Sequence, residues 1–303
     1  TFGYFDDMDH NSSSRFTHDL VIYEAEALPE RYRGGLFGVE PVTGQLVLSE
    51  VSRDRSSFRT RDINRPVKTA DPWFRPVNIE LGPGGALYIA DFHEQRIDHS
   101  SHYAGRVARG TGRIYRLTGK ETPVAAPRDF SRLDSAALVK LFSSPDRWVR
   151  HQASRLLGQR RDEATTGLLE RELFSGKRPL EALWSLGYGR PLDDKLALRA
   201  LSHPDEHVRR WAVRLVCDQR QVSGALVDRL VKLGAGEKAL EVRSQLASSA
   251  GRLPAVDCLR LVETLSAHDE DSGDVHIPLL LWWAIESKLE ANRDAVVALF
   301  SDN

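Results

Sequence analysis

Three side chains that could do acid–base or metal chemistry lie close together in the first half of the chain. Asp91, His93 and His99 follow a short apolar run and are expected at the end of one strand and along the next. A histidine beside a carboxylate can act as a general base or ligate a metal. The same residues can also be structural, with Asp91 capping a turn and the histidines hydrogen-bonding at the surface or between sheets. We therefore assign no catalytic residue and no metal site from the sequence.

Short strands are the elements that must position these side chains. Val77–Leu81 alternates like a half-buried strand, and Gly82–Gly85 supplies a tight turn. Ala86–Ala90 is an apolar run typical of a buried strand, and Gln95–His99 and Gly112–Leu117 are expected to complete the set. Four short antiparallel strands joined in sequence are typical of one blade of a β-propeller.

A second blade-like group precedes this one. It is expected from four segments, namely His18–Tyr23, Leu36–Val39, Gln45–Val51 and Phe58–Asp62. Two blades make about half of even a small propeller, since propellers have roughly 4–8 blades. We therefore predict the closing blades of a partial β-propeller over residues 1–122. Because the chain starts at Thr1 and shows no signal peptide, we expect it to be a fragment or a processed product.

The spacing of apolar residues changes after a proline-containing linker, residues 123–132. The string SPDRWVRHQASRLLGQR from Ser144 is repeated as HPDEHVRRWAVRLVCDQ from His203, with Ala153 and Ala212 at equivalent places in an apolar helical stripe. Helix pairs that each bury one face against the next pair build an α-solenoid. The predicted fold class is therefore mixed, all-β and then all-α, with a solenoid over residues 133–303.

Each of these repeated helices carries an acid in its first turn and an arginine in the next. Asp146 with Arg150, and Asp205 with Arg209, are spaced as i, i+4 pairs. Such pairs stabilise a helix by a few tenths of a kcal/mol each, roughly 0.2–0.5 kcal/mol. We therefore expect each arginine to be paired within its own helix.

Composition argues against several classes of function. The 303 residues carry a formal net charge of −1, which gives no bulk attraction for nucleic acid. The longest apolar run, Ile277–Ile285, is too short to cross a bilayer, and its Trp282 and Trp283 are expected in the solenoid core. Cys217 and Cys258 lie in helical patterns and are expected to be buried thiols. They form no CxxCH motif, so no haem is expected on this chain.

The first half resembles a known group of propellers. The strings that carry the resemblance are YRGGLFGVEPVTGQLV, DPWFRPVNIELGPGGALYIADF and GRIYRL, and they resemble the closing blades of propellers related to soluble PQQ-dependent sugar dehydrogenases and sorbosone dehydrogenases. The helical half resembles HEAT repeats, in a short form of about thirty residues. The combination is similar to exported planctomycete-type proteins that resemble membrane-bound dehydrogenases. It covers roughly residues 15–118 and 130–303.

The resemblance implies the C-terminal portion of an exported, periplasmic, quinone-dependent sugar or alcohol dehydrogenase, whose HEAT solenoid docks proteins such as a c-type cytochrome. Arg75 stands close to the place of a basic residue that binds the quinone carboxylates, and Asp91, His93 and His99 are further cofactor-binding candidates. The general-base histidine and the calcium ligands are implied to lie upstream of Thr1. PQQ and calcium are therefore expected only in the full-length protein. The alternative is a non-catalytic interaction scaffold.

Overall fold

The computed structural model describes residues 18–94, 103–104, 110–122, 126 and 128–301, which fall into two compact units. The β unit takes its described residues from Thr1–Ser52, Arg59–Asp129 and Ser144–Arg150. The helical unit takes them from Arg53–Phe58, Phe130–Ser143 and His151–Asn303. The tip of one β-hairpin, Arg53–Phe58, therefore belongs to the helical unit.

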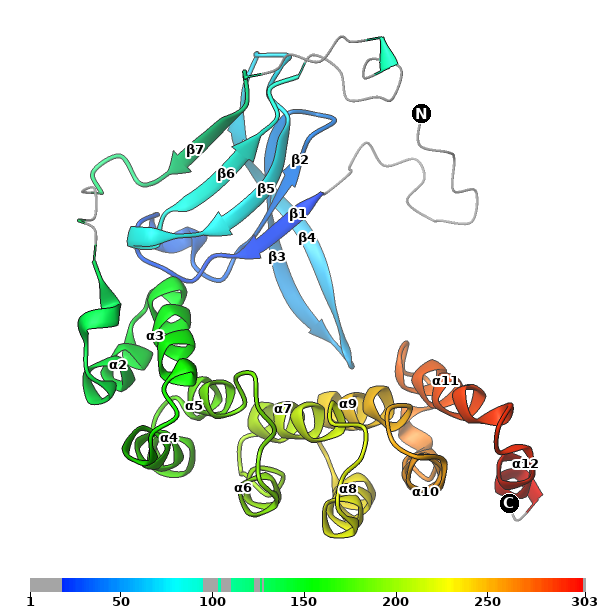
Figure 1. Ribbon diagram of the computed structural model, residues 1–303. Coiled ribbons are helices and arrows are strands. Elements are labelled where there is room, and N and C mark those ends of the chain that lie inside the picture. The colour runs from blue at the N-terminus through cyan, green and yellow to red at the C-terminus, as the bar shows by residue number, and fades with distance from the viewer. Residues whose placement is uncertain (1–17, 95–102, 105–109, 123–125, 127, 302–303) are drawn as a thin grey trace. The chain divides into compact units, whose positions relative to one another are not determined.

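The first sheet is a meander of four described strands in the order β1-β2-β3-β4 (Figure 1). The strands are β1 (Asp19–Ile22), β2 (Leu36–Glu40), β3 (Gln45–Asp54) and β4 (Ser57–Lys68). Strand β2 is buried along its whole length because it lies between β1 and β3. Strand β4 runs well beyond the expected Phe58–Asp62 and contains Pro66. A proline is tolerated there because β4 is an edge strand, where one missing N–H breaks no central ladder.

The second sheet contains three described strands, β5 (Pro76–Leu81), β6 (Leu87–Asp91) and β7 (Arg113–Leu117), in that order. Its antiparallel register places Ile79 opposite Ile89 and Ile89 opposite Tyr115. Strand β7 pairs directly with β6, which leaves no place between them for the expected strand at 95–99. That segment lies outside the described residues.

The two sheets share one apolar core within the β unit. Phe37 from the first sheet and Ile79 and Leu87 from the second are at most 1 % exposed. The Tyr23 hydroxyl donates to the Gly85 carbonyl at 3.0 Å and accepts the Leu28 N–H at 2.7 Å, so a buried polar group is satisfied across the core. Two antiparallel sheets are therefore confirmed, while closure of a propeller ring is not seen in the described residues.

The helical unit is built from packed helices in two rows (Figure 1). In one row α2, α4, α6, α8, α10 and α12 follow one another, and the other row contains α3, α5, α7, α9 and α11. The described helices are α2 (Ser135–Lys140), α3 (Arg147–Gln159), α4 (Glu163–Ser175), α5 (Pro179–Leu186), α6 (Asp194–Ala200), α7 (Glu206–Cys217), α8 (Gly224–Gly236), α9 (Leu240–Ala250), α10 (Ala255–Ser266), α11 (Ile277–Leu289) and α12 (Arg293–Ser301). This alternation confirms that a helical repeat region follows the β-structure.

The apolar stripe predicted from the repeats is buried. Ala153, Ala182 and Ala212 are all 0 % exposed, so neighbouring helices approach closely at these small side chains. The two cysteines, Cys217 and Cys258, are buried and free, and burial raises their thiol pKa values to about 12 and about 11. Trp282 and Trp283 are 54 % and 52 % exposed, so the expectation that they fill the solenoid core is wrong.

Two arginines of this series, Arg209 and Arg243, join successive repeats, whereas Arg150 donates to Glu24 of the β unit at 2.5 Å. The Arg209 guanidinium donates to Glu237 at 2.7 and 2.8 Å and to the His203 carbonyl at 2.9 Å. Asp205 instead caps its own helix, since it accepts the backbone N–H groups of the first turn. Arg243 repeats this arrangement with Asp271, at 2.6 and 2.5 Å. The arginine therefore bridges loops of neighbouring repeats.

Candidate functional site

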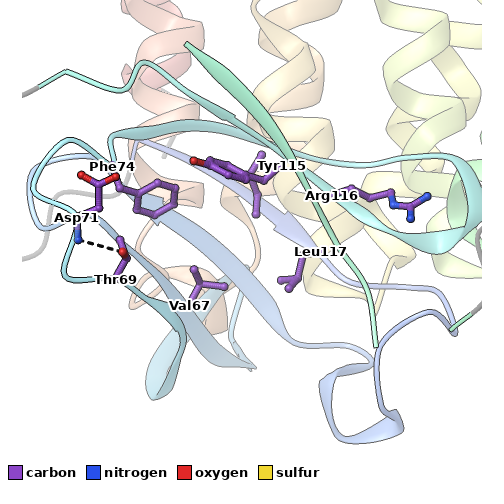
Figure 2. Close-up of a pocket in the computed structure, with 8 residues that line it drawn as sticks. Val67, Thr69, Asp71, Phe74, Tyr115, Arg116 and Leu117 are labelled. Carbon is purple, nitrogen blue, oxygen red and sulfur yellow. Dashed lines mark hydrogen bonds between the residues drawn. The ribbon is translucent and has the colours of Figure 1, made fainter. Parts of the chain in front are cut away.

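A cavity of about 310 Å³ opens beside β7 in the β unit (Figure 2). Small-molecule and side-chain pockets typically begin at roughly 300 Å³. The cavity is lined by Val67, Thr69, Asp71, Phe74, Ile89, Tyr115, Arg116 and Leu117. These residues come from the end of β4, the loop before β5, and strands β6 and β7, so the whole cavity belongs to one unit.

Aromatic and aliphatic side chains form most of the cavity wall. The Phe74 and Tyr115 ring centroids are 5.8 Å apart with their planes at 68°, an edge-to-face arrangement. Figure 2 shows the Phe74 ring and Tyr115 together on one side of the cavity, with Val67 and Leu117 opposite. Tyr115 is 39 % exposed whereas Ile89 is 2 % exposed, so the cavity runs from the surface toward the sheet core. It can accept an apolar or aromatic group.

A carboxylate lies at one end of this cavity. Asp71 Oδ1 accepts the Trp73 N–H at 2.9 Å, and its Oδ2 lies 3.3 Å from His93 Nε2. The hydrogen bond from Trp73, followed by that from His93, lowers the pKa of Asp71. The Asp71 N–H donates to Thr69 Oγ1 at 3.0 Å, as drawn in Figure 2. Asp71 is thus an ionised, locally fixed group.

Asp91 caps the turn that carries His93. Its Oδ1 accepts the backbone N–H groups of Arg75 at 2.7 Å and His93 at 2.8 Å, and the residue is 4 % exposed. His93 has a positive φ of 50°, a conformation uncommon outside glycine. Among the described residues, Asp91 Oδ2 and His93 Nδ1 are buried without a hydrogen-bond partner. Buried polar atoms of this kind are costly and usually have a reason.

The structure brings two of the sequence candidates together, whereas the guanidinium of a third, Arg75, lies elsewhere. Asp91 and His93 meet through the backbone, and Asp71 joins them from the loop before β5. Arg75 Nη1 donates to the Phe74 carbonyl at 3.0 Å and lies 3.6 Å from where a Cβ on Gly44 would stand. Its guanidinium therefore lies beside the β2–β3 turn. His99 lies outside the described residues.

The described side chains do not fit a quinone that carries carboxylates. Arg75 already donates to a backbone carbonyl, and the other charged groups of the turn, Asp71 and Asp91, would repel such a ligand. No group of three or more His, Cys, Asp or Glu residues suited to a metal occurs among the described residues. We assign neither PQQ nor calcium to this part of the chain.

The helical unit carries an aromatic row that sequence reasoning missed. His151, Trp184 and Trp211 come from α3, α5 and α7, with ring centroids 6.2 and 5.3 Å apart at successive steps. The Arg214 guanidinium lies 5.6 Å from the Trp211 ring centroid and extends the row as a cation–π contact. The sequence signal that could have predicted this row is one aromatic residue on each successive helix of the row. The four residues His151, Trp184, Trp211 and Arg214 are called the aromatic row below.

The same row of helices holds the hairpin tip, Arg53–Phe58. Arg53 Nη2 lies 3.2 Å from Glu206 and 2.6 Å from Glu241, a carboxylate also bound by Arg210. These contacts make α7 and α9 one side of a binding surface for a polypeptide turn.

Asp274, at the start of α11, holds the far end of the tip. The Ser56 N–H and hydroxyl donate to its carboxylate at 3.1 and 2.5 Å. Burial opposes its ionisation, but hydrogen bonds from Ser56, His276 and Ile277 outweigh that cost and lower the Asp274 pKa to about 2.

Comparison with known proteins gives one match. Residues 4–121 match DUF7133, a domain of unknown function. The DUF7133 segment ends before the helical region, which follows it in the chain. No curated protein and no solved structure matches the chain. Among the described residues, no helix has the length and apolar character needed to cross a membrane.

Proposed function

We propose that this chain is a protein-binding scaffold, and that the α3–α5–α7–α9–α11 row binds an extended segment of a partner. The observation that supports this most directly is the hairpin tip. Its Arg53 and Ser56 are held by three carboxylates on this row, Glu206, Glu241 and Asp274. The row thus already presents groups that bind a polypeptide turn through charge-assisted hydrogen bonds.

The aromatic row gives the neighbouring helices a different chemistry. Trp184 and Trp211 supply stacking surface, and the Arg214 side chain is 50 % exposed beside them. Arg210, one helical turn before Arg214 on α7, is paired with Glu241, so Arg214 is the cation that this stretch places beside the rings. Rings and arginine are the side chains most enriched at interface hot spots. The partner segment is therefore proposed to carry an acidic residue next to an aromatic or large apolar residue.

A peptide selection tests this proposal. Random peptides displayed on phage would be selected on the full chain. Their affinities would be measured from the change in tryptophan fluorescence of the chain on binding. Enriched peptides should pair an acid with an aromatic residue, and Trp211→Ala should weaken them by about 30-fold, because a hot-spot residue contributes about 2 kcal/mol. Phe174→Ala on α4, a partly buried ring of the other row, is the matched control and should leave affinity unchanged. Peptides that bind equally well to Trp211→Ala and Arg214→Ala would overturn the proposal.

A second candidate is the exported quinone-dependent dehydrogenase implied by the resemblance, with the helical unit as a docking site for a c-type cytochrome. Two successive antiparallel sheets that share a core favour it, because neighbouring propeller blades pack in this way. The isolated chain, given PQQ and calcium, should not reduce a redox dye with sugars or alcohols, since the carboxylates of Asp71 and Asp91 would repel the quinone carboxylates. PQQ-dependent turnover that Arg75→Ala abolishes would instead place a working site within these residues.

A further inference from the structure

Strand β7 is an exposed edge beside an apolar cavity. Within the described residues it pairs with β6 on one side only, whereas the neighbouring sheet has a fourth strand. None of its five residues is buried, and Ile114 is 77 % exposed. An edge strand with apolar side chains offers its unpaired N–H and C=O groups to another chain, and natural proteins usually protect such edges.

The cavity lies on one face of this edge. Tyr115 and Leu117 both line it, and they stand opposite Ile89 and Leu87 of β6 in the sheet register. Side chains two residues apart on a strand point to the same face. A strand added next to β7 would therefore direct alternate side chains toward the cavity. Phe74 and Val67 complete the apolar wall, so the space suits one large apolar side chain.

Charge further restricts what could be added. Arg113 and Arg116 are exposed on β7, and Arg116 also lines the cavity. Cross-strand pairs of opposite charge stabilise a sheet, while like charges opposite each other destabilise it. An added strand that carries an acidic residue is thus favoured over a basic one.

We propose that β7 binds an extended segment of a partner protein by strand addition. The segment forms main-chain hydrogen bonds with the free edge of β7, places one large apolar side chain in the cavity, and presents an acidic residue to Arg113 or Arg116. Main-chain pairing supplies affinity in this mode of recognition, and pockets for alternate side chains supply specificity. The proposal is independent of the partner proposed for the aromatic row.

The probe is a set of peptides selected on the full chain from a random phage library. Peptides whose binding is weakened by Trp211→Ala are first removed, because they bind the aromatic row. Thr69→Trp should weaken the remaining peptides by at least about tenfold, because Thr69 is exposed and its replacement fills the cavity. Lys68→Trp, the exposed neighbouring position that does not line the cavity, is the matched control and should bind normally.

Backbone chemistry separates strand addition from simple cavity filling. N-methylation of the peptide at alternate residues should abolish binding for one set of positions and spare the other, because only every second N–H faces β7. Hydrogen exchange should show that the β7 amides facing away from β6 are exposed in the free chain and slowed by the peptide. Equal effects of both methylation sets would overturn the proposal, as would protection in the free chain of those β7 amides that face away from β6.

Discussion

Arg243 in the helical unit and Arg61 in the β unit both meet a carboxylate at 2.5 Å, in Asp271 and Glu50 respectively. Their surroundings differ completely. The side chains of the first pair are 6 % and 4 % exposed, whereas those of the second are 73 % and 56 % exposed. Loss of one partner leaves an uncompensated buried charge only in the helical unit, so the same contact has a structural role there and almost none on β4.

The two units also differ in how often such a contact recurs. In the helical unit, Arg209 and Glu237 are 28 residues apart, and Arg243 and Asp271 are again 28 apart. Two steps between neighbouring repeats are therefore joined by an arginine and a carboxylate at the same spacing. The β unit relies instead on one apolar core and leaves β7 exposed at its edge. Stabilising contacts are distributed along the helical unit, whereas in the β unit they are concentrated in one core.

The largest effect is expected from breaking the buried pair. Arg243→Ala should lower the free energy of unfolding of the helical unit by about 3–5 kcal/mol, because Asp271 loses its partner in a buried setting. Denaturant unfolding followed by circular dichroism measures this. Arg260→Ala is the control, since its pair with Asp228 is exposed on both sides. Similar losses in the two variants would contradict the role given to burial.

Asp274 should give the helical unit a pH dependence. Its pKa is about 2 in the folded chain, below the value of about 3.9 in an unfolded chain. The resulting stability, about 2 kcal/mol, is present above about pH 4 and is lost as the pH falls toward about 2. The stability difference between the wild type and Asp274→Asn should shrink across that range. Asp228→Asn, which removes a carboxylate exposed at the surface, is the matched control variant.

Overpacking tests the close approach of helices in one row. Ala212 is 0 % exposed at an equivalent place to Ala153, so Ala212→Leu should cost about 1–3 kcal/mol. Ala235→Leu, on the exposed face of α8, should be nearly neutral. Thermal unfolding of both variants provides the measurement, and an unchanged midpoint for Ala212→Leu would mean that the face is not packed.

The smallest effect is expected on the β-hairpin. Arg61→Ala removes an ion pair with Glu50 that is exposed on both sides, so the free energy of unfolding should change by about 0–1 kcal/mol. At high salt the effect of Arg61→Ala on the free energy of unfolding should be smaller still, because salt screens the ion pair in the wild type. A loss comparable to that of Arg243→Ala would remove the contrast between the two units.

The sequence predicted the repeated helices because their apolar period is local. The burial of Val208 and Ala212 follows from spacing within a single helix. The partner of Arg209 could not be predicted in this way, since Glu237 lies in the next repeat and the i, i+4 acid is used as a cap. The predicted burial of Trp282 and Trp283 was wrong, because an apolar run alone does not show which face of a helix is covered.

The candidate sites depended on contacts between distant segments. Asp91 and His93 stood out by type and spacing, and their shared turn is a local feature. The cavity was not predictable, because Val67, Ile89 and Tyr115 come together only through sheet register and packing. The carboxylate that meets His93, Asp71, lies 22 residues earlier. The aromatic row had a sequence signal only once the helices of one row were aligned.

The hairpin tip has a consequence for the order of events during synthesis. Ser56 and Asp274 are 218 residues apart in the chain. At about 5–20 residues per second, a ribosome makes the acceptor roughly 10–40 s after the donor. Until then Ser56 has no partner, and Arg53 has none until Glu206 and Glu241 are made. A nascent chain therefore displays the hairpin tip without its Asp274 contact during that interval, when chaperones that bind exposed strands can reach it.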